Sequence, residues 1–584
     1  MTARSHTAHT LARCAFVLFA AFFVSTTPTL AAPLADAGEA IYQRGIAGSG
    51  EPVEAMHDGA VRMRGAEAAC VNCHRRSGLG AREGNNLIPP ITGEYLTHAR
   101  TRDPNAGDAG DASDIPFIDG MRTARDPYTD ATLARAIRDG VDPNGRQLGY
   151  LMPQFALNDA DMAALIAYLK RLDHARAPGV ADTTLHFATI ITPDADPVKR
   201  RGMLAVLEQY FADKNATPLG ATPALRSSRK MMFMVNRRWE LHVWELHGPP
   251  STWQAQLVED MARQPVFAIL SGLGGSNWAP VHDFCEAQRV PCLFPNVEVP
   301  VTSPGDFYSL YFSKGVLLEA ELIAQRIVDE AHDPPGTPHH TATRVRQIYR
   351  KGDSGEAAAG ALAAALKGKP FEVANVALAP GESVAHALRG VAAGEVLVLW
   401  LRPNDIEALR GSPPPPRVFV SGLMGGLDHA PLPERWRNVA SLAYPVDLPD
   451  GRRVRVDYAF GWFAIRRIPV VDERVQVDTW LACGLLAETL SHLVDAFVRD
   501  YLVERVDDML EHRVLTGFYP RLSLATGQHY ASKGGYIVRF AQPDSSRVVA
   551  DGPWTVPQSA SPSPTAAPIA KLDTHLPLAD SKAR

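Results

Sequence analysis

The sequence predicts a multidomain chain in which an all-α domain is followed by a two-lobed α/β region. Its length of 584 residues exceeds what one hydrophobic core normally supports. A Cys-x-x-Cys-His motif at residues 70–74 lies among short helical patterns within residues 33–176. Strand and helix patterns then alternate along residues 184–550, which is typical of parallel α/β sheets. These three observations give the order of the predicted domains.

The composition indicates an ordinary folded protein. Hydrophobic residues make up 46% of the chain and charged residues 21%, as in globular domains. The formal net charge is −5 and the sequence contains no block of basic residues. Nucleic acid is therefore not an expected partner.

Residues 1–32 have the layout of a secretory signal peptide. Two arginines precede an apolar run at 15–24, and small residues follow up to Ala31 and Ala32, where cleavage is expected. This apolar run is too short for a membrane span, which needs about 20 residues. We therefore expect an exported mature protein without a membrane span, located in a bacterial periplasm.

The motif Cys70-Val71-Asn72-Cys73-His74 is the attachment pattern for c-type haem. Each thiol can form a thioether with a haem vinyl group, and the adjacent imidazole can then ligate the iron. A bare Cys-x-x-Cys would also fit thioredoxin-like chemistry or half a zinc site. The histidine, the missing second Cys-x-x-Cys and the export signal favour haem.

The second axial ligand is predicted from the helices that follow. Helical patterns cover residues 35–44, 128–140 and 159–172, with Asn158 or Asp159 as the cap of the last one. Met152 precedes Pro153 in the loop between the last two helices, a position that resembles the place of the ligand methionine in small cytochromes c. The alternatives are Met121 or no methionine ligand. The methionines of this domain are Met56, Met63, Met121, Met152 and Met162.

Residues 33–176 resemble the class I cytochrome c family at Cys70, Cys73, His74, Met152 and the terminal helix. This resemblance implies one covalently attached haem c with axial ligation by the histidine and the methionine. Such ligation leaves no open iron position and suits one-electron transfer, so an enzyme is not expected.

The resemblance also implies a backbone partner for the proximal histidine. In the family, a proline carbonyl accepts the histidine N–H, and Pro89 and Pro90 are equal candidates for that carbonyl. The family has no counterpart for the segment at 100–128, which is rich in Asp, Gly, Pro and Ala and is expected to be a loop.

The α/β region is expected to begin after a linker at 177–183 and to end before a disordered tail at 551–584. Long helices are predicted at 197–214 and 475–501. The predicted strands cover residues 184–192, 231–235, 241–245, 266–271, 290–294, 345–349, 373–377, 396–401, 417–421 and 439–443.

This region resembles the type I periplasmic solute-binding proteins, in the branch of the branched-chain amino-acid receptors. The resemblance lies in the segments 184–214, 266–276, 290–295, 518–523 and 532–538. It implies two α/β lobes joined by three crossovers, with a small molecule bound between them at the carboxyl ends of the strands.

The resemblance places four ligand candidates in the cleft, namely Ser276, Asn296, Glu298 and Ser354. Ser276 follows a glycine-rich turn and could offer its hydroxyl and nearby N–H groups to a carboxylate. Glu298 would repel a ligand carboxylate, and Ser354 stands where the family has tyrosine. An ordinary α-amino acid is therefore not the expected ligand.

The remaining cysteines leave one question open. Cys285 and Cys292 are seven residues apart, and in an oxidising compartment they could form a disulfide or stay as two buried thiols. Cys483 lies on an apolar helical pattern and is expected in the core.

Together these features predict a periplasmic electron-transfer protein. Its lobe pair would bind a small molecule or dock a redox partner such as a dehydrogenase. The alternative is a small-molecule receptor, of the ABC-transporter or sensory type, in which haem senses the redox state. An enzyme that oxidises a substrate held in the cleft is the least favoured interpretation.

Overall fold

The structure is a computed structural model. It describes residues 34–83, 86–98, 125–172, 176–216, 237–301, 303, 305–332, 343–392, 394–493, 496–524 and 527–557. The predicted signal peptide, the predicted strand at 231–235, Met121 and most of the segment at 100–128 lie outside these residues.

The amino-terminal domain is helical, as predicted, and also contains two small antiparallel sheets that the sequence did not indicate. Strands β2, β1 and β5 form one sheet, and β3 pairs with β4 in the other. Its elements are α1 (Leu34–Arg44), β1 (Glu54–His57), β2 (Val61–Arg64), η1 (Gly65–Ala68), α2 (Val71–His74), β3 (Ala81–Glu83), β4 (Asn86–Ile88), α3 (Gly93–Thr97), α4 (Asp130–Asp139), β5 (Gln154–Phe155) and α5 (Asp159–Arg171).

Local sequence determines where these helices begin and end. Thr129 caps α4 through a capping box with Thr132, and Gly140 ends the helix in the left-handed region at φ 68°. The Asn158 side chain accepts the N–H of Asp161 and so caps α5, as predicted. Gly38 allows helices α1 and α5 to cross closely. A Cβ at this position would lie 2.2 Å from a carbonyl oxygen of α5.

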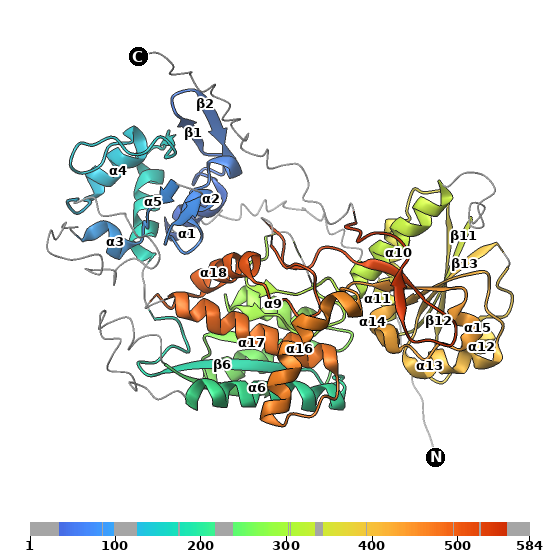
Figure 1. Ribbon diagram of the computed structural model, residues 1–584. Coiled ribbons are helices and arrows are strands. Elements are labelled where there is room, and N and C mark those ends of the chain that lie inside the picture. The colour runs from blue at the N-terminus through green and yellow to red at the C-terminus, as the bar shows by residue number, and fades with distance from the viewer. Residues whose placement is uncertain are drawn as a thin grey trace, which may run out of the picture.

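Lobe one contains a parallel five-stranded sheet in the order β10-β9-β8-β6-β7. The late helices α16, α17 and α18 return to this lobe, and α17 packs against α6 (Figure 1). The elements are β6 (Thr184–Ile191), α6 (Pro197–Ala216), β7 (Arg238–Glu245), η3 (Pro250–Thr252), α8 (Trp253–Arg263), β8 (Ala268–Leu270), α9 (Ala279–Ala287), β9 (Cys292–Leu293), β10 (Ser309–Leu310), α16 (Pro449–Arg466), α17 (Glu473–Leu493) and α18 (Arg499–His512).

Lobe two contains a seven-stranded sheet in the order β12-β11-β13-β14-β15-β16-β17. The first five strands are parallel, and β16 and β17 continue the sheet antiparallel. The elements are α10 (Val316–Ala331), β11 (Arg344–Arg350), α11 (Ser354–Ala365), β12 (Glu372–Leu378), α12 (Val384–Ala387), β13 (Glu395–Trp400), α13 (Pro403–Glu407), η4 (Ala408–Gly411), β14 (Arg417–Ser421), α14 (Gly422–Gly425), η5 (Leu427–His429), α15 (Glu434–Arg437), β15 (Ala440–Tyr444), β16 (Tyr536–Phe540) and β17 (Val548–Ala550).

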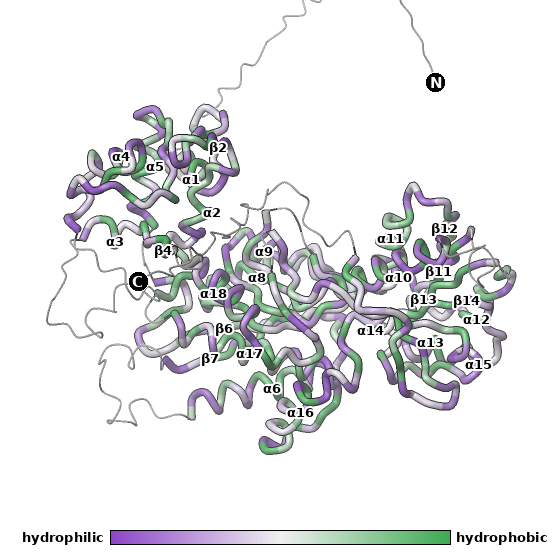
Figure 2. The backbone as a smooth tube through the Cα atoms, turned by 45° about the horizontal axis from the view of Figure 1, so that its top comes forward, coloured by the Kyte–Doolittle hydropathy of each residue, from purple (hydrophilic) through white to green (hydrophobic). Residues whose placement is uncertain are grey.

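The chain passes between the lobes after β10, after β15 and after α18, in agreement with the three predicted crossovers. Hydrophobic segments gather in the interior of each lobe, along the strands and the inner helices (Figure 2). Of the helices that the structure describes, none is both long and apolar enough to cross a membrane.

Several sequence-based boundaries differ from the structure, and three of these differences concern whole segments. The predicted helix at 475–501 is two helices, because α17 ends at Leu493 and Val498 is extended before α18 begins. The apolar pattern continued across this break because Phe497 is buried in the same core.

The other two differences concern the ends of the α/β region. Residues 551–557, assigned to the tail, are packed, because Asp551 accepts from Arg326 at 2.9 Å and Thr555 pairs with Gly535. The linker at 177–183 is packed as well, since Val180 pairs with Leu185. Residues 558–584 lie outside the described part of the chain.

Candidate functional site

Helix α2 brings the two cysteines of the attachment motif onto one helical turn. The amides of Cys73 and His74 both donate to the Cys70 carbonyl, at 3.2 and 2.9 Å. Both cysteine side chains are partly exposed. Two thiols one turn apart beside a histidine are the donor set that covalent attachment of haem requires.

The His74 side chain is oriented by a backbone carbonyl. Its Nδ1 lies 3.0 Å from the Pro89 carbonyl oxygen, so Nδ1 donates this hydrogen bond and Nε2 keeps its lone pair. Of the two prolines considered as candidates, Pro89 therefore makes the contact. Burial lowers the pKa of His74 to about 4, and the hydrogen bond to Pro89 raises it only in part. The imidazole is neutral near pH 7, as an iron ligand must be.

Met152 lies in the loop between α4 and β5, where its N–H donates to the Gly149 carbonyl at 3.0 Å. Its side chain is partly buried and packs against the core of the amino-terminal domain. Met162 lies within α5, and Met56 and Met63 lie on β1 and β2. Among the described methionines, Met152 is the one in a loop.

The loop after the attachment motif is packed against lobe one. The backbone N–H and hydroxyl of Ser77 both donate to the Glu504 carboxylate on α18, at 2.9 and 2.6 Å. Leu79 is buried, with 4% of its surface exposed, in a hydrophobic cluster that contains residues of both lobes, α17 and α18 included. The loop after the attachment motif, which we call the haem loop (residues 75–80), is therefore part of the core of the α/β region.

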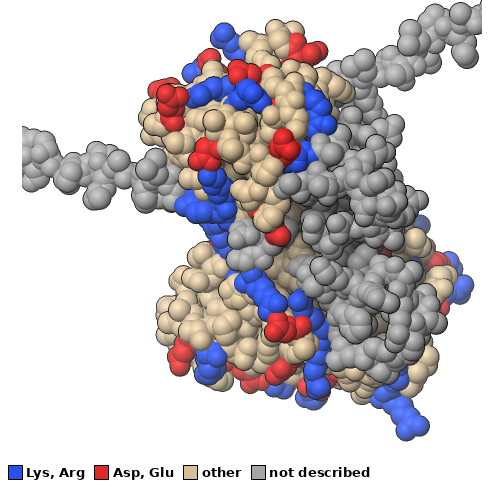
Figure 3. Space-filling model, turned by 90° about the vertical axis from the view of Figure 1, so that its left-hand side faces the viewer, with Lys and Arg blue, Asp and Glu red and all other residues tan. Residues whose placement is uncertain are grey.

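Two further contacts hold the same boundary. The Arg76 guanidinium lies 4.7 Å from the centre of the Phe307 ring, and Arg289 of lobe one pairs with Glu39 of α1 at 2.7 Å. Within lobe one, next to these contacts, Tyr308 donates to Asp500 on α18 at 2.5 Å. Figure 3 shows Lys and Arg side chains along the waist between the amino-terminal domain above and lobe one below.

Burial changes the pKa of the Glu504 carboxylate, which accepts both hydrogen bonds from Ser77. Desolvation raises the pKa of Glu504 to about 7, although the two hydrogen bonds from Ser77 lower it in part. Desolvation also raises the pKa of Asp500. Two acids near this loop therefore hold protons more tightly than they would in water.

A cleft with a space of about 310 Å³ lies between the lobes. Lobe one contributes the turn after β8 and the segment after β6, and lobe two contributes the segments after β11, β12 and β13. These are carboxyl ends of strands, where ligands of open α/β sheets are bound. The lining residues are Asp194, Gly275, Ser276, Arg350, Lys351, Gly352, Asp353, Pro380 and Arg402.

Ser276 lines this cleft, but its backbone N–H already has a partner within the chain. The N–H donates to Asp194 Oδ2 at 3.1 Å, and Thr192 donates to the other oxygen of the same carboxylate at 2.5 Å. Ser276 was expected to bind a carboxylate of the ligand. In the structure, the carboxylate that its N–H binds is that of Asp194.

Glu298 and Ser354 belong to an ionic cluster that joins the lobes, which we call the interlobe clamp (Glu298, Asp353, Ser354 and Arg402). Arg402 donates to both oxygens of Glu298, at 2.7 and 2.6 Å, and also to Asp353. The Ser354 hydroxyl donates to Glu298 at 2.7 Å. Burial alone would raise the pKa of Glu298, but hydrogen bonds and charge from Arg402, with Lys199 and Ser354, lower it to about 2.

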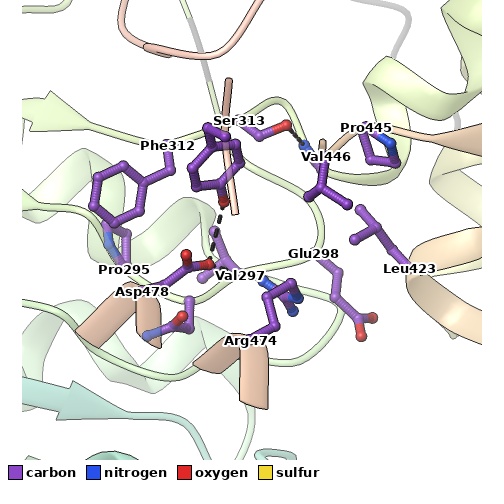
Figure 4. Close-up of a pocket in the computed structure, with 13 residues that line it drawn as sticks. Pro295, Val297, Glu298, Phe312, Ser313, Leu423, Pro445, Val446, Arg474 and Asp478 are labelled. Atoms are coloured by element: carbon purple, nitrogen blue, oxygen red, sulfur yellow. Dashed lines mark hydrogen bonds and ion pairs between the residues drawn. The ribbon is translucent and has the colours of Figure 1, made fainter. Parts of the chain in front are cut away.

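Asn296 is a structural residue and does not line the cleft of about 310 Å³. Its side-chain amide donates to Ser271 at 3.0 Å and to Thr479 of α17 at 3.3 Å. Asn296 and Glu298 instead border a smaller cavity of about 30 Å³ (Figure 4). We call it the hinge cavity, because residues of all three crossovers between the lobes line it. The four candidates are therefore not brought together around one ligand.

The hinge cavity is lined by Asp478 of α17, an acid whose pKa is strongly shifted. Burial raises the pKa of Asp478 to about 7, while Arg474 and the hydroxyl of Tyr519 lower it in part. Tyr519 donates to Asp478 Oδ2 at 3.1 Å, and Oδ1 has no hydrogen-bond partner among the described residues. The cavity is large enough for a water molecule that could reach it.

Cys285 and Cys292 are both free and fully buried. The structure therefore has two buried thiols here, which was the second of the two alternatives. They lie close enough for a side-chain hydrogen bond, and burial raises the pKa of Cys285 well above its ordinary value.

Sequence reasoning missed three residues of these sites, namely Asp194, Arg402 and Glu504. Asp194 follows β6 and Arg402 follows β13, at the carboxyl ends where cleft residues are found, so position alone could have suggested them. Glu504 is one of many acids on an amphipathic helix, and no local signal distinguishes it.

Comparison with known proteins identifies the amino-terminal domain. Residues 64–173 match the family described as Cytochrome c. No curated protein matches the chain.

Solved structures similar to this chain include three bacterial binding proteins. A fatty acid ABC transporter substrate-binding protein from Thermomonospora curvata is 14% identical, with TM-score 0.44, and the match covers 66% of this chain and 96% of that chain. A substrate-binding periplasmic protein from Ralstonia solanacearum is 16% identical, with TM-score 0.47, covering 63% and 100%. A branched chain amino acid ABC transporter structure from Thermus thermophilus with bound valine is 11% identical, with TM-score 0.46, covering 65% and 98%.

The family match covers the attachment motif, Met152 and helix α5. Residues 64–173 of this chain belong to the cytochrome c family, and they precede a two-lobed α/β region.

Proposed function

We propose that this chain is an exported electron carrier with one haem c, attached to Cys70 and Cys73 and ligated by His74 and Met152. The haem would supply one-electron redox chemistry. The observation that carries the proposal is the neutral His74 ring, whose Nδ1 donates to Pro89 and whose Nε2 is left for a metal.

The chain's own residues would perform three tasks in this role. Pro89 fixes the plane of the proximal imidazole, and Met152 supplies a soft sulfur ligand that favours the reduced state. The contacts of Ser77 and Leu79 hold the haem loop on lobe one. The carrier and the lobe pair would therefore move as one body, and no catalytic residue is required.

The haem ligands can be tested by spectroscopy of the haem-loaded protein. We expect one haem per chain and a far-red sulfur-to-iron charge-transfer band in the oxidised wild type. Met152→Ala should remove this band, whereas Met63→Ala, a partly buried methionine on β2, should keep it. A band that persists in Met152→Ala would exclude Met152 as the ligand.

The role of the lobes in electron transfer can be tested by reduction kinetics. We propose that the lobes dock a periplasmic dehydrogenase or bind its small-molecule substrate. Stopped-flow mixing with candidate reduced dehydrogenases should then reduce the haem rapidly, and more slowly in variants of the cleft. If no periplasmic dehydrogenase reduces the haem, the carrier role is wrong.

A second candidate function is a periplasmic small-molecule receptor in which haem senses the redox state. The cleft favours it, since Arg350, Lys351 and Arg402 face a space of about 310 Å³ that could hold an anion. Thermal shift against amino acids, organic acids, alcohols and aldehydes tests it, because a ligand that binds only the native state raises its stability. Ligand stabilisation without electron transfer to any partner would favour this second role.

A further inference from the structure

Two histidines and a glutamate meet on one face of the lobe-one sheet, at a place that the proposed electron-transfer function does not use. His186 lies on β6, and Glu240 and His242 lie on the neighbouring parallel strand β7. The register places Glu240 directly opposite His186, while His242 is opposite Ala188. Because side chains two residues apart share a face of a strand, all three side chains lie on the same face.

The ligand atoms are close enough to share one ion. His186 Nδ1 lies 3.1 Å from His242 Nε2 and 3.7 Å from Glu240 Oε2, and all three ligand atoms lie within 4.8 Å of one another. With metal–ligand bonds of about 2.05 Å, these separations correspond to angles of about 98° and about 129° at the metal. Both angles are within the range of a distorted tetrahedral site.

The site is open to an ion from solution. The Glu240 side chain is 53% exposed and that of His186 is 20% exposed. The opposite face carries the buried aromatic residues Phe187 and Trp239, which hold the two strands in this register. The three ligand side chains therefore project from two strands that are paired in register, on a side that water can reach.

We propose that His186, Glu240 and His242 form a binding site for a divalent late transition-metal ion such as Zn²⁺. Two imidazoles and a carboxylate are the ligand types that zinc and its neighbours prefer. Strand β7 is at the edge of the described sheet and pairs with β6 alone. A bound ion would join the edge strand to β6 through side chains.

This site is separate from the cleft between the lobes. His186 lies in the first half of β6, five residues before Ile191 at the carboxyl end. At about 3.3 Å per residue, that end is roughly 16 Å away. The ion would therefore act on lobe one itself.

The test uses zinc titration of the haem-loaded mature chain after treatment with a chelator. Calorimetry should show one Zn²⁺ bound per chain with an unchanged haem spectrum. Loss of a group that only orients a zinc ligand already weakens binding 10–100-fold. His242→Ala removes a proposed ligand itself, so it should weaken zinc binding at least tenfold. The matched control is His332→Ala, an exposed histidine at the end of α10, which should bind as the wild type does.

Zinc should also raise the thermal midpoint of the wild type but not that of His242→Ala. Glu240→Gln, which changes one exposed atom, is the second variant and should bind zinc more weakly than the wild type. If the wild type binds no zinc, or if all variants bind it equally, the two histidines form only a hydrogen bond and the proposal is wrong.

Discussion

The interlobe clamp is expected to contribute strongly to the stability of the α/β region. Glu298 is 8% exposed and lies between β9 and β10 of lobe one, whereas Arg402 follows β13 of lobe two. Arg402→Met would remove both hydrogen bonds to this carboxylate and leave a buried charge with Lys199 at 3.9 Å and the Ser354 hydroxyl as its remaining partners.

The magnitude follows from the titration of Glu298. Its pKa falls from an ordinary value of 4.5 to about 2, which corresponds to about 3 kcal/mol in favour of the folded state. This agrees with the 3–5 kcal/mol that the loss of one partner of a buried ion pair typically costs. Since the folded-state pKa is depressed, this contribution is present above about pH 4.5 and is lost as the pH falls towards about 2.

The assay is denaturant unfolding of the wild type and variants at pH 7 and at pH 3. Arg402→Met should lower the unfolding free energy by about 3 kcal/mol at pH 7 and by less at pH 3. The double variant Arg402→Met, Glu298→Gln should recover part of the loss, because Glu298 is then no longer an unpaired buried charge. An Arg402→Met protein within about 0.5 kcal/mol of the wild type at pH 7 would refute the reasoning.

Three further predictions concern other sites. Because the pKa of Glu504 is raised to about 7, its protonated form is favoured in the folded state, and the thermal midpoint should fall as the pH rises from about 4.5 to 7. Glu504→Gln should flatten this part of the profile, and an unchanged slope would show that other groups cause it. The denatured, haem-loaded mature protein should show three reactive thiols, from Cys285, Cys292 and Cys483, whereas a count of one would indicate a disulfide. Asp194→Asn removes a negative charge from the cleft and should strengthen binding of organic anions about fivefold or more by calorimetry, whereas weaker binding would exclude a repulsive role.

Local chemistry made the attachment motif and the helices of the amino-terminal domain predictable, but not its two small sheets. The attachment motif requires only five consecutive residues, and the caps Thr129 and Asn158 act within one helical turn. The choice between Pro89 and Pro90 could not be made from sequence. The two prolines are consecutive and each has a backbone carbonyl that could accept the hydrogen bond. Only the path of the folded chain shows which carbonyl faces His74.

The cleft was predictable in position but not in chemistry. Strands of nearly continuous apolar sequence, such as β13 and β14, identified the parallel sheet and therefore its carboxyl ends. The partners of the candidate residues come from distant parts of the sequence. Glu298 pairs with Arg402, 104 positions away, and such a contact depends on how the lobes close.

The burial of Leu79 has a consequence for the biogenesis of this protein. The loop that follows the cysteines contributes a side chain to the same hydrophobic cluster as helices α17 and α18. Lobe one therefore completes its interior with a residue whose position depends on the haem-bearing loop. We expect chains without covalently attached haem to mature slowly and to be degraded, so that attachment of the cofactor serves as a checkpoint for the whole chain.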